Sequence, residues 1–339
     1  MRARGIVSTI QEVAQRAGVS TGTVSRYLNG YKLKQKNMDA IKQAIADLDY
    51  RPNLTARSLR RSRSMTIGLM INNMKNNLAT QVVSQIETEI EQADYSMLIA
   101  GFRKSRSVFE QHLQTLVNRG IDGLILFEAP RVEDGHVDPV ASIDLPILSI
   151  NTPYNAPNVD SILPKNKESS FEVVSKMIEF GHRHIGIIAA PQQEQVSRER
   201  LQGALDAISS AGLPPESATV LFGDYSPNSG RQCMSALLDM GVDCVFTCNY
   251  KMGMGALQAA TEAGRTIGQN LSYACYDYDD THEMFYPRLT TVCPPAYELG
   301  HLAGQELLSM IESGQRGSGK TTLLDNMINW QPSIVDLRG

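Results

Sequence analysis

The sequence lacks the marks of a secreted or membrane-spanning protein. Its 339 residues contain no apolar run long enough to cross a membrane, and no continuous apolar stretch follows the two arginines near the N-terminus. Five cysteines stand singly, without paired spacing. We therefore expect reduced, mostly buried thiols, a cytoplasmic location and no membrane partner.

Signs of catalysis are also missing, because no nucleophile and base stand at a convincing spacing. One segment, GQRGSGKT at residues 314–321, matches the phosphate-loop pattern G-x-x-x-x-G-K-[ST]. A phosphate loop follows a strand and opens a helix, whereas this segment follows a helical pattern and precedes a strand-like run, TTLLDNMINW. We predict a flexible helix-to-strand loop rather than a nucleotide site, and no enzyme.

What the sequence does have is a strong asymmetry of charge. The net charge is −4, but residues 1–64 hold 13 Lys and Arg against 4 Asp and Glu, a net of +9 that leaves −13 for the rest. This asymmetry predicts a basic module for a polyanion, joined to an acidic body. A basic solvated tail is the simpler alternative, but a tail does not show helical periodicity.

Residues 9–48 show three helical patterns. Thr9 with Glu12 predicts a capping box, Gly18 a tight turn and Ser20 the cap of the second helix. The apolar positions expected to face one another are Ile10, Val13, Ala14 and Ala17, then Val24, Tyr27 and Leu28, then Met38, Ile41, Ile45 and Leu48. Two short helices joined by a glycine turn, on a basic background, predict a helix-turn-helix.

The residues themselves narrow this prediction. Residues 9–29 read T-I-x-E-V-A-x-x-A-G-V-S-x-x-T-V-S-R-x-L-N, which resembles the opening of the lactose/galactose repressor (LacI/GalR) family, and YRPNLTARSLR, residues 50–60, resembles its hinge. The resemblance implies an all-α helix-turn-helix DNA-binding domain at 1–52 and a hinge helix or linker at 53–64. It also implies an α/β effector-binding and dimerisation domain at 65–339.

Family positions assign roles to the second helix, which is expected to read the major groove with Thr21, Gly22 and Arg26. Arg26 can make two hydrogen bonds to guanine, Thr21 can offer a methyl or a hydroxyl, and Gly22 offers no side chain. The neighbouring residues expected to contact phosphates or serve the structure are Ser20, Thr23, Ser25 and Asn29. For Thr23 and Ser25, helix capping and exposure to solvent are the simpler explanation.

The hinge is expected to form a short helix capped by Asn53. In this helix Leu59 would enter the minor groove as an apolar wedge and kink the site. The arginines expected on phosphates are Arg57, Arg60, Arg61 and Arg63. Without the resemblance, RSLRRSRS reads only as a basic linker.

The third helix departs from the family pattern. Lys34 stands where a Ser or Thr cap is usual. We therefore expect this helix to begin later, near Asn37, without a change in the interpretation of the module.

From Met65 onward, strand-like runs alternate with amphipathic segments. The strand-like runs are residues 66–71, 95–100, 123–127, 146–150, 184–190, 244–248 and 271–276. Helical patterns lie at residues 78–93, 107–119, 168–180, 197–211 and 251–264. This alternation predicts doubly wound parallel sheets with helices on both faces, and the length favours two subdomains.

Segments of this body, among them IDGLIL, FGHRHIGII, RERLQGAL and CNYKMGMGAL, resemble the regulatory domain of the same family. That domain is similar to a periplasmic sugar-binding protein, with two lobes, a ligand in the cleft and three crossings of the chain. The first lobe is expected at about 65–163 and 293–323, and the second at about 164–292 and 324–339.

The resemblance also implies the effector contacts. Arg200 matches the ligand arginine, and Asn249 and Asp277 match the Asn and Asp that bond sugar hydroxyls at strand ends. Two positions differ from the family, since Lys165 replaces an Asp and Tyr250 replaces the Asp that usually follows Asn249. Lys165 with Arg200 can hold a phosphate or carboxylate, which predicts an anionic or phosphorylated effector. A neutral sugar is the alternative, with Lys165 pointing away.

Two further clusters have simpler explanations than a metal. DYDDTH, residues 277–282, follows a strand in a loop, and its Asp277 already has an effector role by family position. His182 and His184 follow a glycine that ends a helix, where capping or packing is common. We predict no metal and no cofactor.

These features together predict a sequence-specific transcriptional regulator, most simply a repressor. It is expected to bind a pseudo-palindromic operator in double-stranded DNA as a homodimer. A sugar or sugar phosphate in the cleft would change lobe closure and release the operator, and a co-repressor would act with the opposite sign. A solute-binding module would require a signal peptide and no helix-turn-helix, and a nucleotide-dependent enzyme rests only on the misplaced phosphate-loop pattern.

Overall fold

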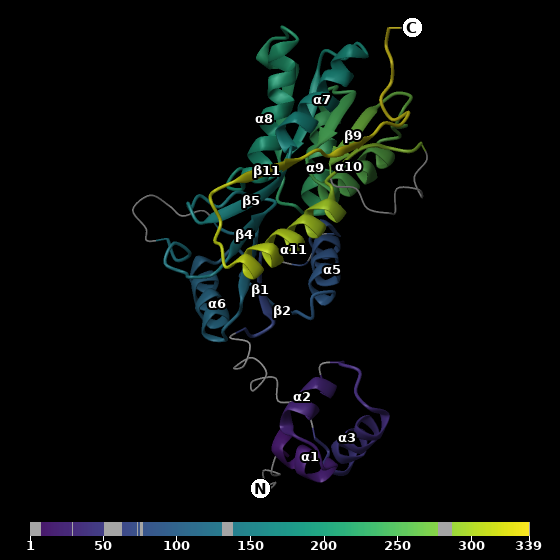
Figure 1. The fold of residues 1–339 in the computed structure, drawn as a ribbon. Coiled ribbons are helices and arrows are strands. Elements are labelled where there is room, and N and C mark those ends of the chain that lie inside the picture. The colour runs from purple at the N-terminus through teal and green to yellow at the C-terminus, as the bar shows by residue number, and fades with distance from the viewer. Residues whose placement is uncertain are drawn as a thin grey trace, which may run out of the picture. The chain divides into compact units, whose positions relative to one another are not determined.

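Figure 1 shows the computed structural model, which describes residues 8–28, 30–50, 63–72, 74, 77–130, 138–276 and 287–338. The chain divides into two compact units, Met1–Ser64 and Met65–Gly339. Within the described part, no helix is long and apolar enough to cross a membrane. The predicted domain boundary at residue 52 falls outside the described residues and stays a prediction.

The first unit contains the helices α1 (Ile10–Ala17), α2 (Thr21–Leu28) and α3 (Gln35–Asp47). Thr9 and Glu12 form the predicted capping box. Thr9 Oγ1 accepts a hydrogen bond from the Glu12 N–H at 3.3 Å, and the Glu12 carboxylate accepts one from the Thr9 N–H at 2.6 Å. Gly18 ends α1 in the left-handed region, with a φ of 67°, which confirms the predicted turn.

An apolar core holds the three helices together. It buries Val13, Ala14, Val24, Ile41, Ala44 and Tyr50, and the residues that pack against it include Ile10, Ala17, Tyr27, Leu28, Ile45 and Leu48. Met38, which the periodicity also places there, is not part of this cluster. The predicted faces of the helices are therefore largely confirmed.

The predicted start of the third helix is wrong. α3 begins at Gln35, with Lys34 as its N-cap, rather than near Asn37. Lys34 makes no side-chain hydrogen bond as a cap. Most helical stability in a protein comes from packing of the apolar face, and the buried Ile41 and Ala44 supply that packing here.

The second unit contains two six-stranded sheets. Sheet A consists of β1 (Thr66–Ile71), β2 (Ser96–Gly101), β3 (Gly123–Phe127), β4 (Ile147–Ile150), β5 (Val159–Pro164) and β11 (Thr321–Leu324), in the order β11-β5-β4-β3-β1-β2, and all its pairs are parallel. Sheet B consists of β6 (Ile185–Ala189), β7 (Ala218–Phe222), β8 (Cys244–Thr247), β9 (Ser272–Tyr276), β10 (Thr290–Cys293) and β12 (Met327–Asn329), in the order β12-β10-β9-β8-β6-β7. β12 runs antiparallel to β10, and the other pairs of sheet B are parallel. The predicted doubly wound parallel sheets are confirmed.

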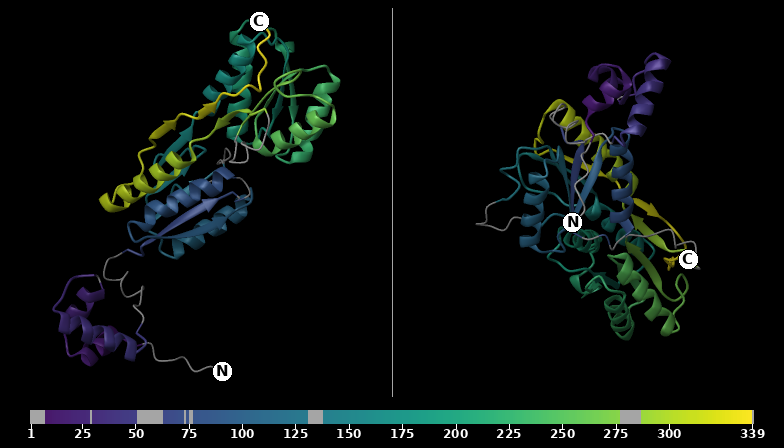
Figure 2. Two further views of the ribbon diagram at one scale, coloured as in Figure 1. Left: turned by 90° about the vertical axis from the view of Figure 1, so that its right-hand side faces the viewer. Right: turned by 90° about the horizontal axis from the view of Figure 1, so that it is seen from below.

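Helices cover both faces of each sheet, because parallel strands carry apolar side chains on both faces and these must be shielded from water. α5 (Asn77–Glu91) and α11 (Ala296–Ser313) share one core with sheet A, and α6 (Arg106–Asn118) covers its other face. α7 (Asn166–Glu179) and α8 (Gln195–Ser210) cover one face of sheet B, and α9 (Pro227–Asp239) and α10 (Tyr250–Glu262) cover the other. A short 3-10 helix, η1 (Pro215–Ser217), precedes β7. We call sheet A with its helices lobe 1 and sheet B with its helices lobe 2; Figure 2 shows both from two further sides.

The chain crosses between the lobes three times, where β5 leads into α7, β10 into α11 and β11 into β12. The strand-like run at residues 321–330 is therefore two strands in two different sheets. The first and third crossings are tied together. The Lys165 N–H donates to the Leu324 carbonyl at 2.8 Å, and Asn326 Nδ2 donates to the Lys165 carbonyl at 3.2 Å.

The five cysteines agree with the prediction of reduced, mostly buried thiols. Cys233, Cys244, Cys248 and Cys275 are buried, Cys293 is half-buried, and all five are free. Burial raises the pKa of the Cys244 thiol well above its ordinary value.

The segment after β12 lies along lobe 2 and is anchored by Ser333. Ser333 is fully buried, and its hydroxyl donates to the Tyr273 carbonyl at 2.6 Å and accepts from the Thr290 N–H at 2.7 Å. Farther along, the Leu337 N–H donates to the Phe180 carbonyl at 2.8 Å.

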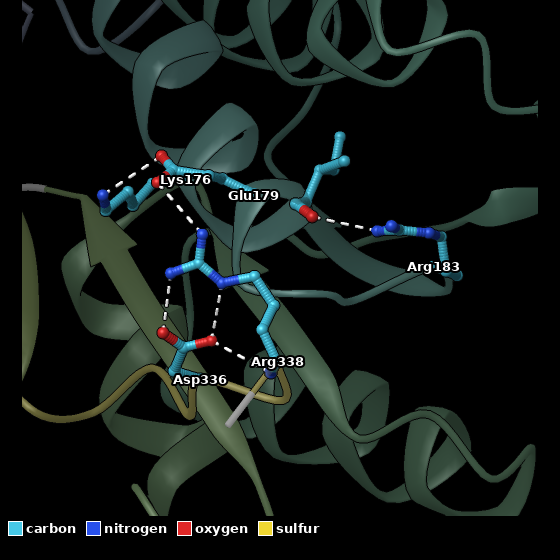
Figure 3. A network of polar contacts seen from close by, with 6 residues as sticks. Lys176, Glu179, Arg183, Asp336 and Arg338 are labelled. Carbon is cyan, nitrogen blue, oxygen red and sulfur yellow. Dashed lines mark hydrogen bonds and ion pairs between the residues drawn. The ribbon is translucent and has the colours of Figure 1, made fainter.

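The outer contacts of this segment, drawn in Figure 3, join exposed side chains. The Arg338 guanidinium pairs with Asp336 at 2.7 Å and with Glu179 at 3.5 Å, and Lys176 pairs with the same Glu179 at 3.1 Å. Hydrogen bonding from Arg338 lowers the pKa of Asp336 to about 2. Because these groups stay in solvent, their pairing adds little to stability.

We expect Ser333→Ala to lower the free energy of unfolding by about 1–3 kcal/mol, because the buried Thr290 N–H and Tyr273 carbonyl lose their shared partner. Arg338→Ala, in the same segment, should change it little. Urea unfolding followed by circular dichroism compares the two variants. Equal destabilisation by both would show that the exposed contacts, and not the buried hydroxyl, anchor the segment.

Candidate functional site

Thr21, Gly22 and Arg26 lie together on the exposed side of α2. Residues four apart share a helix face, so Gly22 and Arg26 are neighbours, and Thr21 lies beside Gly22. Val24 is fully buried in the three-helix core and fixes the orientation of the helix. The fold thus presents the three predicted base-reading positions to solvent as one surface.

The hydroxyl groups at the start of α2 serve as a cap. Ser20 Oγ accepts from the Thr23 N–H at 3.2 Å and lies 2.9 Å from Thr23 Oγ1. Thr23 and Ser25 are half-buried. These contacts support the structural explanation of Ser20 and Thr23, and they leave the exposed positions of α2 as the stronger candidates for base contacts.

Several predicted residues lie outside the described part of the chain, and their roles stay predictions. In the first unit and the predicted hinge these are Asn29, Asn53, Arg57, Leu59, Arg60 and Arg61, and in the body Asp277. Arg63 is described and half-buried.

Gly22 is not required by the packing of its module. A Cβ at this position would meet only Ser20 Oγ, at 3.8 Å, which is an ordinary contact distance. Its backbone also lies outside the left-handed region that favours glycine. A longer side chain therefore fits here without a clash and would project from the exposed surface of α2.

Arg200 is the centre of the second predicted site. It lies on α8 with 3% of its surface exposed. Arg200 Nε donates to Asn166 Oδ1 at 3.2 Å, and Nη1 donates to the Cys248 carbonyl at 2.9 Å. The guanidinium carbon lies 3.6 Å from the centre of the Tyr276 ring, a cation–π distance. A buried charge needs such partners, and here they come from α7 and from the carboxyl ends of β8 and β9.

Gly203 allows α8 to approach α7 closely enough for these contacts. A Cβ at this position would lie 2.0 Å from the Lys167 carbonyl oxygen in the first turn of α7. The helix pair therefore requires glycine at this point, one turn after Arg200.

The sequence does not single out two residues that complete this site. The Tyr276 hydroxyl donates to the Asn166 carbonyl at 3.2 Å and lies 2.8 Å from Asn326 Nδ2. Tyr276 ends a buried strand just before a run of polar residues in the sequence, DYDDTH, which is a signal that sequence reading can use. Asn326 has no such signal, because its partners Lys165 and Tyr276 are far away in the chain.

Lys165 does not point toward Arg200. It is the N-cap residue of α7, and its Nζ pairs with Asp325 Oδ1 at 2.7 Å in the third crossing. Its hydrogen bond to Asp325 raises the pKa of Lys165. The structure therefore places this cation in the connection between the lobes.

Asn249 and Tyr250 begin α10 at the carboxyl end of β8. Asn249 Oδ1 accepts from the backbone N–H groups of Lys251 and Met252, at 3.0 and 3.4 Å, and so caps the helix. Because Arg200 bonds the carbonyl of the preceding Cys248, Asn249 lies next to the buried guanidinium. Arg200 and Asn249 are thus brought together.

The phosphate-loop pattern occurs in the reversed context that the sequence indicates. Residues 314–320 connect α11 to β11. Asp160 Oδ1 accepts hydrogen bonds from the N–H groups of Ser318 and Lys320, at 2.7 and 2.9 Å. A carboxylate of the chain itself therefore takes backbone donors that a phosphate would need.

His182 packs in the interior of lobe 2. Its Nε2 lies 2.9 Å from Ser272 Oγ and 3.1 Å from the Val335 carbonyl oxygen. His184 Nε2 lies 2.8 Å from Thr219 Oγ1. The packing explanation is confirmed for His182, whereas His184 is exposed. No group of three or more metal-ligating side chains occurs among the described residues.

Two family models match the chain. One, for bacterial regulatory proteins of the lacI family, matches residues 9–53, and one for a periplasmic binding protein-like domain matches residues 174–329. Between them they include the exposed face of α2, Arg200 and Asn249.

Similar proteins extend over nearly the whole chain. A ribose operon repressor of Haemophilus influenzae is 29% identical and covers 98% of this chain and 100% of its own. A transcriptional repressor PurR of the same species (strain PittEE) is 28% identical and covers 94% and 96%. A lac repressor dimer bound to operator and the anti-inducer ONPF is 25% identical, with a TM-score of 0.85 over 97% of this chain and 100% of that chain. The structural match confirms the predicted fold class, and the similar proteins named here are repressors, in agreement with the prediction of a non-catalytic protein.

We expect Gly22→Gln to alter the preference of the protein for duplex sequences while leaving its stability nearly unchanged. The open surroundings of Gly22 accept the side chain, and glutamine can make two hydrogen bonds to adenine. Selection from a random duplex library measures the preference, and thermal unfolding measures the stability. A large loss of stability with an unchanged preference would contradict this role.

Proposed function

The chain belongs to the lacI family of bacterial regulatory proteins, and we propose that it represses transcription by binding an operator as a homodimer. The exposed Thr21–Gly22–Arg26 surface of α2 carries the proposal, since it offers one guanidinium and one hydroxyl to base edges. The basic balance of residues 1–64 adds affinity for phosphates that does not depend on sequence. Leu59 is proposed to wedge the minor groove.

A homodimer presents two such surfaces to the two halves of a pseudo-palindrome. The lac repressor named above was solved as a dimer on operator. The outer strands of both sheets expose large apolar side chains, Ile99 on β2, Phe222 on β7, Leu323 on β11 and Met327 on β12. Exposed apolar side chains on edge strands favour coverage by another chain, which supports self-association.

We propose that the effector is a neutral, sugar-like polyhydroxy compound held between the lobes near Arg200 and Asn249. A phosphate or carboxylate favours a second cation, and Lys165 is already paired with Asp325. The carboxylate of Glu199 lies close by, because its Oε2 accepts a hydrogen bond from Asn166 Nδ2 at 3.3 Å. The site thus combines donors and acceptors suited to hydroxyl groups.

Effector and operator are proposed to act on each other through lobe closure. An effector that binds one degree of closure better shifts the protein toward it. By linkage, operator binding then changes the effector affinity by the same factor.

We expect the full chain to retard DNA taken from upstream of its own gene, and Arg26→Ala to weaken that binding about tenfold or more. Lys42→Ala is the control, because it removes the same positive charge from an exposed position on α3 rather than on α2. It should keep the preference for this DNA over a scrambled duplex. Binding should also weaken steeply as salt rises. If Arg26→Ala binds both duplexes as the unchanged protein does, α2 is not the reading helix.

For the effector, calorimetry with D-ribose, other pentoses and hexoses, each beside its phosphate, tests the neutral class. We expect a neutral sugar to bind at least as well as its phosphate, and Lys165→Gln to leave that binding unchanged. Tighter binding of a phosphate that Lys165→Gln abolishes would instead establish an anionic effector.

A further inference from the structure

Two loops, one from each lobe, meet through their side chains. Lys104 follows β2 in lobe 1, whereas Glu194 precedes α8 and Tyr225 follows β7 in lobe 2. Lys104 Nζ pairs with Glu194 Oε1 and lies 5.2 Å from the centre of the Tyr225 ring. The Tyr225 hydroxyl donates to Glu194 Oε2 at 2.5 Å and lies 2.6 Å from Ser197 Oγ. One cation of lobe 1 thus contacts both a carboxylate and an aromatic face of lobe 2.

The order of the strands places this contact far from the crossings. β2 and β7 are outer strands of their sheets. The three crossings leave from β5, β10 and β11, and β11 and β12 form the opposite outer edges. A rotation about the crossings therefore separates the ends of β2 and β7 more than any other pair of strand ends.

Residues on both sides of the contact have an unusual backbone conformation. Arg103, Lys104 and Tyr225 have φ values of 49°, 61° and 68°, in the left-handed region that is costly for residues other than glycine. Such conformations persist only where the surroundings fix them, and they gather at binding and switch regions. Here the buried Asn72 accepts the Lys104 N–H with its side chain and the Arg103 N–H with its carbonyl, both at 2.9 Å.

We propose that Lys104, Glu194 and Tyr225 form a clasp that favours the closed arrangement of the two lobes. Opening of the cleft breaks the ion pair and uncovers the Tyr225 ring, whereas the Lys165–Asp325 pair stays intact beside the crossings. The strength of the clasp then sets the fraction of closed protein on which effector and operator act. The effect of the clasp on effector and operator binding rests on the proposed function, whereas its effect on the distance between the lobes does not. The clasp and the proposed function can therefore fail separately.

The clasp is weak enough to work as a switch. The side chains of Lys104 and Glu194 are 57% and 31% exposed, so water and salt screen their attraction. Pairs of this exposure shift an equilibrium by about two- to fivefold. We therefore expect removal of the clasp to raise the ratio of open to closed protein by about this factor, and high salt to act in the same direction.

The distance between the lobes can be measured directly in the full chain. Spin labels at Asn118→Cys on α6 and Asp239→Cys on α9 report the distance between lobe 1 and lobe 2, because both positions are exposed. Cys293→Ser removes the half-buried native thiol, and the other cysteines are buried. The distances are measured by electron–electron double resonance. Labelled protein is diluted with excess unlabelled protein, so that distances between labels on different copies do not contribute.

The variants are Lys104→Glu, Glu194→Lys and the double variant that carries both substitutions. In the double variant the two positions again have opposite charges, with their signs exchanged. Each single reversal should populate longer distances between the lobes, and the double variant should return the distribution toward the original. Lys167→Glu is the matched control. Lys167 pairs with Asp206 at 2.7 Å with similar exposures, 51% and 34%, but both residues belong to lobe 2.

The control should leave the distances unchanged. The clasp is overturned if the single reversals keep the original distribution, if the double variant stays as open as the single ones, or if Lys167→Glu opens the lobes equally.

Discussion

The buried guanidinium of Arg200 is the constraint on which the arrangement of lobe 2 depends. An unpaired charge in this position would cost several kcal/mol. It is satisfied by Asn166 on α7, by the Cys248 carbonyl at the end of β8 and by the Tyr276 ring at the end of β9. The start of α7 and the carboxyl ends of β8 and β9 must therefore lie at the same place. These contacts also link the site to the connection between the lobes, because Asn326 in the third crossing donates to both the Tyr276 hydroxyl and the Lys165 carbonyl.

The body is thus joined firmly on one side and weakly on the other. Near the crossings, backbone hydrogen bonds and the half-buried Asn326 tie the connecting segments together. At the opposite edges the clasp depends on partly exposed charges. A molecule built in this way can change its closure without a change of fold, which is what the proposed linkage between effector and operator requires.

Much of the architecture follows from local patterns in the sequence. The capping box of Thr9 and Glu12, the turn at Gly18 and the apolar faces of α1 and α2 depend on residues only a few positions apart. The alternation of strands and helices in the body is equally local. The patterns fail where distant residues decide the outcome. Lys165 pairs with Asp325, 160 positions away, and one strand-like run is divided between two sheets. α3 begins at Gln35 although its N-cap residue, Lys34, makes no capping hydrogen bond, because packing of the apolar face outweighs the missing cap.

The central claim is that α2 of two copies reads the two halves of one operator. Selection of binding sites by the unmodified full chain from a fully random duplex library, followed by sequencing, tests it most directly. The account predicts enrichment of a motif whose two halves are inverted copies of each other, at a fixed spacing. No enrichment over the starting library, or a motif without inverted symmetry, would contradict it.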